Sequence, residues 1–368
     1  MSAVEYLTFA DCFEDISRGV GKIKQKDYLL QGDHPVIDQG QDVVAGYGNG
    51  EEGLCTNVPA IVFGDHTRCV KYVARPFFAG ADGVKILKPR NNHNTRYWFH
   101  SLRSKHIENL GYSRHYKLLK ECGFRKHTYK EQDQISARLD RILELINTEM
   151  DSVEKLDELV KSRFIEMFGD GEGFASVPME RLVPGIVSGT NVAGNQRPIK
   201  DGEYGVLKIS AVTQGWFKAD EYKVVDDVSR VKMVHPRKGD LLFSRANTSE
   251  MVGATAIVDR DYENLFLPDK LWRLDPAQDV EAVFLKNLLS TNKLRAEMSK
   301  VSTGTSGSMQ NISMRKFRKL QAFLPPMELQ REFAEFVGRV DKSAFEARQA
   351  IDKLQLLYDS LAQEYFGD

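Results

Sequence analysis

The chain has 368 residues, enough for two or three domains that each bury a core of their own. Apolar residues make up 42% and charged residues 28%, a balance typical of soluble globular proteins, and no apolar run approaches the roughly 20 residues that cross a bilayer. The net charge is −1 and the four cysteines form no CxxC pair, which argues against a zinc site and favours reduced thiols in a cytosolic protein.

Residues 1–128 are expected to form a first globule of mixed strands and loops. Short apolar runs, such as VPAIVFGDHT at 58–67 and ADGVKILKP at 81–89, are bounded by Gly, Asp or Pro, as strands between turns are. Residues 85–130 hold twelve Lys or Arg residues against two acids, together with five of the eight histidines. Such a basic segment with interleaved aromatics suits a polyanion, and ordinary solvated helices are the alternative.

Residues 129–170 are predicted to form one long helix. Apolar residues from Ile135 to Met167 recur at alternating steps of four and three, interrupted by Glu149 and Arg163. This heptad pattern is typical of a helix that packs along a second helix. A helix of about 38 residues is roughly 57 Å long and is stable only when its apolar stripe is buried.

Residues 171–325 are predicted to form a second globule that loosely repeats the first. The runs GDLLFS at 239–244 and PDKLWRLDP at 268–276 occur in the same order as the two runs of the first globule. Residues 286–319 carry eight Lys or Arg residues against a single acid. Each globule is therefore expected to carry its own basic face.

Residues 326–368 are predicted to form a second long helix that repeats the first. Residues 132–170 align with 330–368 without a gap, with ten identities in 39 positions, where chance predicts about two. Both helical segments are acidic, whereas the globules carry the basic stretches. The simplest arrangement is an intramolecular coiled coil of the two copies, and two unrelated surface helices are the alternative.

Taken together, these features resemble the specificity (S) subunits of type I restriction-modification enzymes. The resemblance is carried by LPPMELQ at 324–330, by its degenerate first copy TYKEQ at 128–132, which lacks both prolines, and by GYSRHYKLLKE at 111–121. It implies an α+β fold with two mixed α/β target recognition domains, two long antiparallel coiled-coil helices and a pseudo-twofold internal duplication. The expected boundaries are 1–128 and 171–325 for the two domains, and 129–170 and 326–368 for the two spacer helices.

In this family each target recognition domain reads one half of a bipartite, asymmetric DNA site. The paired helices set the spacing and dock modification (methyltransferase) subunits, two of them by the duplication, and restriction translocase subunits join the full complex. The resemblance therefore implies double-stranded DNA and these subunits as partners, a cytoplasmic location without a membrane, and no catalysis by this chain. S-adenosylmethionine, ATP and Mg²⁺ are expected on the partner subunits, and no cofactor is expected on this chain.

The motifs of the corresponding chemistry are missing from the sequence. It contains no Asp/Asn-Pro-Pro-Tyr/Phe motif for adenine methylation, no Phe-x-Gly-x-Gly loop for the methyl donor, no GxxxxGK[ST] loop and no HExxH pair. The dipeptides Asp33-His34 and Asp65-His66 resemble catalytic or metal-binding pairs, but isolated Asp-His dipeptides in loops are more often structural. We therefore expect no catalytic and no metal-binding residues.

The candidates for DNA contact are loop residues whose side chains can reach base edges or phosphates. In the first domain they are Asp65, His66, Thr67, Tyr112, Ser113, Arg114, His115 and Lys117, and in the second they are Ser244, Arg245, Asn247, Thr248, Thr303, Thr305, Ser306, Ser308, Gln310 and Asn311. Five further cations, expected to neutralise phosphates and to make binding salt-dependent, are Lys88, Arg90, Arg96, Lys316 and Lys319. An ordinary solvated loop is the alternative for each residue.

Two other functions compete with DNA recognition. A single-chain restriction or modification enzyme would need a catalytic domain of a few hundred residues, and the chain has no room for one. A coiled-coil scaffold whose globules bind protein, with no role on DNA, is disfavoured only by the basic loops.

Overall fold

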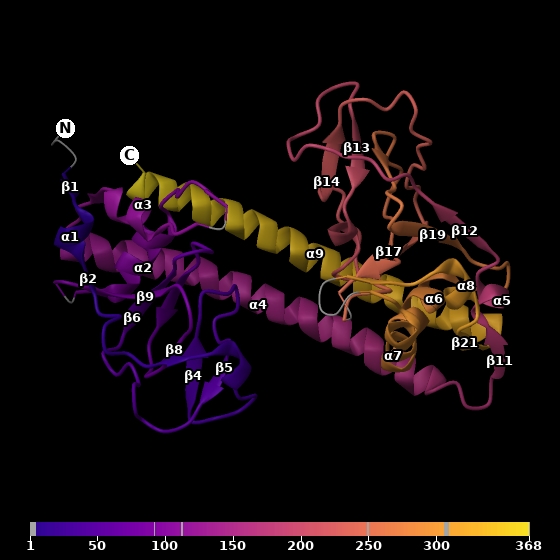
Figure 1. Ribbon diagram of the computed structural model, residues 1–368, viewed down its shortest axis with the longest axis horizontal. Helices are drawn as coiled ribbons and strands as arrows, with labels where there is room; N and C mark the ends of the chain where they lie inside the picture. The colour runs from indigo at the N-terminus through magenta and orange to yellow at the C-terminus, as the bar shows by residue number, and fades with distance from the viewer. Residues whose placement is uncertain (1–4, 92, 112, 249, 305–308, 368) are drawn as a thin grey trace. The chain divides into compact units, whose positions relative to one another are not determined.

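The computed structural model describes residues 5–367 except 92, 112, 249 and 305–308. The chain divides into two compact units, and Figure 1 labels most of their elements. Unit 1 consists of Met1–Ser152 with Ala347–Asp368, and unit 2 consists of Val153–Glu346. Each unit contains one of the two expected globules and a stretch of each long helix.

The globule of unit 1 is built on a four-stranded antiparallel sheet. In spatial order its strands are β2 (Phe13–Asp15), β9 (Val84–Pro89), β6 (Ala60–Gly64) and β7 (Val70–Val73). The central strand β6 is buried along its whole length, because its two faces enter different cores. Ile61 and Phe63 pack into the core that includes the long helices, whereas Ala60 and Val62 pack into a second core.

Smaller elements cover both faces of this sheet. A second sheet has the order β3 (Lys22–Ile23), β8 (Phe78–Gly80), β4 (His34–Ile37) and β5 (Gly46–Gly48), with β8 parallel to both of its neighbours. Residues of the other core come from α1 (Phe9–Cys12), α2 (Thr95–Arg103), α3 (Tyr116–Glu121) and the pair β1 (Tyr6–Leu7) and β10 (Phe124–Arg125). A 3-10 turn spans Gln25–Asp27.

The globule of unit 2 repeats this arrangement. Its main sheet has the order β12 (Gly185–Ser188), β19 (Leu271–Asp275), β15 (Leu241–Ser244) and β17 (Thr255–Ile257), again antiparallel throughout. The smaller sheet has the order β14 (Tyr222–Val225), β13 (Tyr204–Leu207) and β18 (Leu265–Phe266), with β13 and β18 parallel. Two further pairs are β11 (Ala175–Pro178) with β21 (Gln321–Leu324) and β16 (Ala246–Asn247) with β20 (Gln310–Asn311). The helices are α5 (Met179–Leu182), α6 (Ala282–Leu289), α7 (Asn292–Val301) and α8 (Met314–Arg318), and Ile209–Ala211 form a 3-10 turn.

The two globules therefore share one strand order in their main sheets. The apolar run at 58–67 supplies β6 and the run at 239–244 supplies β15, and these strands hold the same place between their neighbours. The runs at 81–89 and 268–276 supply β9 and β19, which also correspond. The loose repeat expected from the order of these runs is confirmed as a repeat of topology.

The two long helices are α4 (Tyr129–Phe168) and α9 (Met327–Phe366). In unit 1, Nη1 of Arg138 donates to the Tyr365 hydroxyl at 3.0 Å, so an early residue of α4 meets a late residue of α9. In unit 2 the order is reversed, and Arg163 pairs with Glu332 at 2.8 Å. The helices are thus antiparallel within each unit, and the expected fold class of mixed α/β globules with two long antiparallel helices is confirmed.

The predicted heptad seam is buried over most of its length, at Ile135, Leu139, Ile142, Ile146, Val160, Phe333, Val337, Val340 and Tyr358. Near the end of each helix the prediction is wrong by one residue, because the buried positions are Phe164, Phe168, Ala362 and Phe366 instead of Arg163, Met167, Leu361 and Tyr365. Arg163, which interrupts the pattern, reaches out to Glu166 and Glu332 instead of entering the core. Among the described residues, no helix combines the length and apolar character that a membrane span requires.

Each long helix has a buried glutamine in its first turns, at equivalent positions of the repeat. Nε2 of Gln132 donates to the His127 carbonyl at 3.0 Å, and Nε2 of Gln330 donates to the Pro325 carbonyl at 2.9 Å. The starts of the two helices differ outside this bond, because the first copy has no prolines. There Thr128 and Glu131 form a reciprocal capping box, with the Glu131 carboxylate accepting from the Thr128 amide at 2.8 Å.

Candidate nucleic-acid interface

In unit 1 the predicted contact residues gather around the turn that follows β6. The amide of Asp65 donates to the Gly83 carbonyl at 2.7 Å, and the carbonyl of Asp65 accepts from the His115 amide at 2.8 Å. These two bonds tie the turn to the start of β9 and to the start of α3. The Asp65 carboxylate turns inward and accepts from the Tyr116 amide at 2.7 Å, so it caps α3 and is only 4% exposed.

The side chains beside Asp65 also make bonds within the chain. His66 donates through Nδ1 to the Ser113 carbonyl at 3.1 Å, and Thr67 donates to the Gln39 carbonyl at 2.5 Å. His115 is fully buried, donating through Nδ1 to the Asp65 carbonyl and accepting at Nε2 from the Leu110 amide at 3.2 Å.

Among the predicted residues here, the exposed side chains are two cations, Arg114 and Lys117, while Ser113 is half-buried. Tyr112 lies outside the described residues. The predicted residues that face solvent are therefore basic, whereas Asp65 and His115 hold the loop in shape.

In unit 2 the turn after β15 is held by the same two backbone bonds. The amide of Arg245 donates to the Lys270 carbonyl at 3.0 Å, and the carbonyl of Arg245 accepts from the Ile312 amide at 2.9 Å. Lys270 directly precedes β19, as Gly83 directly precedes β9. We call this pair of bonds the loop frame; it places Asp65 and Arg245 at corresponding positions of the two units.

A short ribbon extends the loop frame of unit 2. Strand β16 pairs with β20, which sets Asn247 opposite Gln310, and a further bridge joins Thr303 to Asn311 at 2.8 and 2.9 Å. The structure thus brings together four predicted residues, although more than fifty positions separate Asn247 from the other three in the sequence. The predicted residues Thr305, Ser306 and Ser308 lie outside the described part of the chain.

The remaining predicted residues of this loop differ in exposure. Ser244 is buried and donates to the Ala246 carbonyl at 3.1 Å, so it holds the strand end in place. Thr248 is exposed, and its amide donates to the side-chain oxygen of Asn247 at 2.9 Å. The side-chain nitrogen of Asn247 is buried and has no acceptor among the described residues.

Two of the cations expected to neutralise phosphates are occupied inside unit 1. Nζ of Lys88 donates to the Pro59 carbonyl at 2.9 Å, and burial lowers the pKa of its ammonium. Arg96 pairs with Asp140 at 3.2 Å and joins α2 to α4. These side chains stabilise the fold, which makes them weaker candidates for DNA contact than the sequence suggested.

The side chains of the other three cations differ in exposure and in their hydrogen bonds. Nζ of Lys316 donates to the Val301 carbonyl at 2.7 Å and is half-buried. Arg90 is exposed, although its Nε donates to the Ala10 carbonyl at 2.7 Å. Lys319 is the C-cap of α8 and is exposed as well, so Arg90 and Lys319 have the most solvent-facing side chains of the five.

Sequence reasoning missed the residues that bond to Asp65 and Arg245 in the loop frame. Gly83 and Lys270 supply the carbonyls, and Asp269 bonds to the Arg245 side chain. A signal for them was present, because the runs at 81–89 and 268–276 correspond in order and both place these residues just before the strand.

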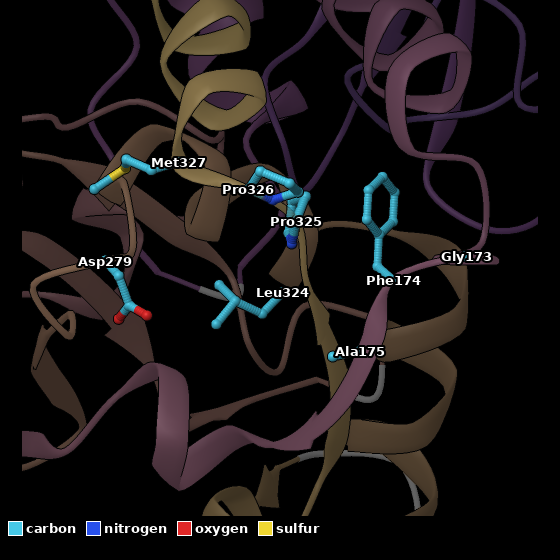
Figure 2. A pocket seen from close by; sticks show the side chains of 8 residues that line it. All are labelled: Gly173, Phe174, Ala175, Asp279, Leu324, Pro325, Pro326 and Met327. Carbon is cyan, nitrogen blue, oxygen red and sulfur yellow. The ribbon is translucent and has the colours of Figure 1, made fainter.

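A hollow of about 510 Å³ lies on other elements of unit 2, beside the pair β11 and β21 and the start of α9 (Figure 2). Phe174, Leu324, Pro326 and Met327 line it, and its one ionisable lining residue, Asp279, has its carboxylate paired with Arg181. The lining contains none of the predicted contact residues. Over the described part of the chain, no group of three or more His, Cys, Asp or Glu residues is placed to hold a metal ion.

Comparison with known proteins points to one family. Residues 190–356 match the family model of the type I restriction modification DNA specificity domain. The specificity subunit of the type I restriction enzyme EcoEI from Escherichia coli is 22% identical over 212 residues, which are 54% of this chain and 35% of the relative. The match therefore spans about a third of that relative's length.

A solved structure shares the fold over the whole chain. The S subunit of a type I restriction-modification system from M. genitalium superimposes with a TM-score of 0.54 at 13% identity, covering 100% of this chain and 98% of the other. At this identity the likeness concerns the fold alone. The shared fold covers the first globule and both long helices as well as the second globule.

Proposed function

We propose that this chain is a type I specificity subunit, which selects the DNA sequence on which a type I restriction-modification complex acts. The support is the match of residues 190–356 to the type I restriction modification DNA specificity domain and the fold shared with a solved S subunit. Residues 1–128 and 171–325 act as target recognition domains, each reading one half of a bipartite, asymmetric site. Residues 129–170 and 326–368 set the distance between the halves.

The chain itself is non-catalytic in this proposal. Methyl transfer belongs to modification subunits and translocation and cleavage to restriction subunits, which bring S-adenosylmethionine, ATP and Mg²⁺ to a complex in the cytoplasm. This part of the proposal draws on the family alone.

The observation that carries the proposal is the loop frame. Two globules with one topology hold the same turn by the same backbone bonds, yet the side chain at that turn is Asp65 in one and Arg245 in the other. A fold that holds the loop backbone in one conformation while the loop residues differ suits two domains that recognise different DNA sequences. Exposed cations beside these loops, such as Arg114 and Lys117, would contact phosphates and make binding salt-dependent.

Repeated residues on the outside of the long helices support a partner that is bound twice. Five identities of the repeat are exposed in both copies, and we call three of them the repeated stripe: Lys155, Leu159 and Glu166 on α4, and Lys353, Leu357 and Glu364 on α9. Their spacing of four and seven places them on one face of each helix. Leu159 and Leu357 are 47% and 48% exposed, so packing within the chain does not account for the identity of these two residues. Contact with two copies of one modification subunit would account for it.

Methylation mapping tests the function as a whole. The chain is expressed with its modification subunit in a host that lacks other methyltransferases, and modified bases are mapped across the genome. We expect one bipartite motif with a gap of fixed length. Methylation that follows no such motif would contradict the proposal, and a gel shift that finds no DNA binding with or without the partner would favour a protein-binding scaffold.

Charge substitutions in the repeated stripe test the docking of partners. Leu159→Arg and Leu357→Arg should each reduce the number of bound modification subunits from two to one, and the double variant should bind none, as measured by native mass spectrometry. Ile165→Arg is the matched control, because Ile165 is exposed on α4 but is not repeated at Gln363. A double variant that still binds two subunits would remove the stripe from the interface.

A further inference from the structure

Arg245 is held more firmly than an ordinary loop residue. Its amide and carbonyl make the two bonds of the loop frame, to Lys270 at 3.0 Å and to Ile312 at 2.9 Å. The residue stands between β15 and β16, so both of its chain neighbours belong to strands. A side chain that starts from such a fixed backbone loses little conformational entropy when it binds a ligand.

The guanidinium of Arg245 is also fixed, on one of its two edges. Nε donates to the Asp269 carbonyl at 2.9 Å, and Nη2 donates to the Asp269 carboxylate at 3.3 Å. Nε and Nη2 form the lateral edge of the group, and one residue occupies both. The terminal edge, made by Nη1 and the second hydrogen of Nη2, has no acceptor among the described residues. The Arg245 side chain is 27% exposed, so a ligand can approach this edge.

Two parallel N–H donors on a rigid planar group match the O6 and N7 acceptors of guanine in the major groove. A phosphate offers similar acceptors, but two features favour the base. The Asp269 carboxylate offsets the charge of Arg245 and so weakens the attraction to a phosphate, while it leaves the donor geometry intact. The ribbon that follows Arg245 carries the amide side chain of Gln310, which suits a base edge and has no charge.

The corresponding position of unit 1 has a different arrangement. Asp65 turns its carboxylate into the protein, where it accepts from the Tyr116 amide. The loop frame therefore presents a forked donor to solvent in unit 2 and no donor in unit 1.

We propose that Arg245, oriented by Asp269, reads a guanine in the half-site bound by unit 2, and that unit 1 reads no base from the corresponding position. The proposal rests on the proposed function and names one residue that determines specificity and the base edge that it recognises.

The test combines a protein variant with a base analogue in the assembled complex. Once the motif is mapped, each guanine of a duplex oligonucleotide is replaced in turn by 7-deazaguanine, which lacks the N7 acceptor. Binding to the wild-type complex should fall about tenfold at one guanine in one half-site. Arg245→Lys keeps the charge but loses the fork, so it should weaken binding to the natural site roughly tenfold to a hundredfold. In that variant, replacing the same guanine by 7-deazaguanine should reduce the binding affinity by less than about twofold.

Arg181→Lys is the matched control, because Arg181 forms another arginine–aspartate pair in unit 2, with Asp279. It should leave the response to each analogue unchanged. The proposal is overturned if the effect of every guanine analogue is the same in the wild type and in Arg245→Lys. It is also overturned if Arg245→Lys weakens binding to all sequences equally, as loss of a phosphate contact would. A complex that methylates no bipartite motif contradicts the proposed function instead, and this result is seen before any analogue is used.

Discussion

The two units hold corresponding turns by the same backbone bonds and place opposite charges on them. In unit 1 the residue of the turn is Asp65, which points inward, and in unit 2 it is Arg245, which points to an acid beside it and to solvent. Backbone hydrogen bonds do not depend on side-chain identity, apart from proline. The difference shows how a duplicated fold keeps its loops in place while the residues that they present diverge.

The seams between the long helices differ in a second way. In unit 2 the seam is an aromatic cluster, with Phe164 against Phe333 at a ring distance of 5.3 Å. In unit 1 it contains a polar chain, in which the buried His100 bonds to the Tyr358 hydroxyl at 2.8 Å and to Asp140 at 2.9 Å. The repeat places Val160 and Gly338 at the positions of Tyr358 and Asp140, so unit 2 has lost or never had this chain.

The largest effect expected from this contrast is the loss of the aromatic seam. Phe164 is 3% exposed and contacts the rings of Phe168, Phe284 and Phe333 at 5.0, 5.8 and 5.3 Å. Phe164→Ala should lower the free energy of unfolding of unit 2 by about 3–5 kcal/mol, because it leaves a cavity that the cluster cannot fill.

Hydrogen exchange followed by mass spectrometry measures this loss for each unit. Protection should fall in strands β15 and β19 of unit 2 and stay close to wild type in β6 and β9 of unit 1. The control is Ile165→Ala, the neighbouring position, which is 66% exposed and should change stability by less than about 0.5 kcal/mol. Equal losses in the two variants would show that the aromatic cluster is not what holds the seam together.

A smaller effect separates the two residues of the loop frame. Asp65→Ala removes the acceptor of the Tyr116 amide at the start of α3 and should destabilise unit 1 by about 1–3 kcal/mol, because a buried N–H loses its partner. Arg245→Ala breaks only a half-exposed ion pair and should cost less than about 1 kcal/mol. Urea unfolding of each variant compares them. If Arg245→Ala proves the more destabilising, Arg245 is structural and the contrast between the frame positions is wrong.

The sequence predicted the fold more completely than the candidate site, for a physical reason. Heptad spacing and alternating runs are local, so the long helices and the strands β6 and β15 were found from them. Lys88, Arg96 and His115 bond to residues far along the chain, and these bonds decide whether the side chains face solvent. No local sequence pattern marks a side chain whose partner is a distant carbonyl or carboxylate. Loop composition pointed to the turns after β6 and β15 and could not separate their inward from their outward side chains.

The smallest expected effect is a pH dependence confined to the polar seam of unit 1. Burial lowers the pKa of His100 from its ordinary value of 6.5, against the opposing influence of Asp140. The neutral ring suits the bonds around it, with Nε2 donating to Asp140 and Nδ1 accepting from the Tyr358 hydroxyl. Below pH 6.5 the unfolded chain binds a proton at His100 that the folded chain does not. Stability is therefore complete above this pH and falls as the pH drops below it, by at most about 1.4 kcal/mol per pH unit.

His100→Gln removes the titration while keeping one donor and one acceptor. Between pH 7 and pH 5, the free energy of unfolding of this variant should fall less steeply than that of the wild type, as measured by urea unfolding at each pH. His127 needs its own variant, His127→Gln, because burial lowers its pKa as well and adds a loss of the same sign. If the wild type and His100→Gln lose stability in parallel, protonation of His100 does not affect the stability of the polar seam. The contrast with the aromatic seam of unit 2 would then be one of packing alone.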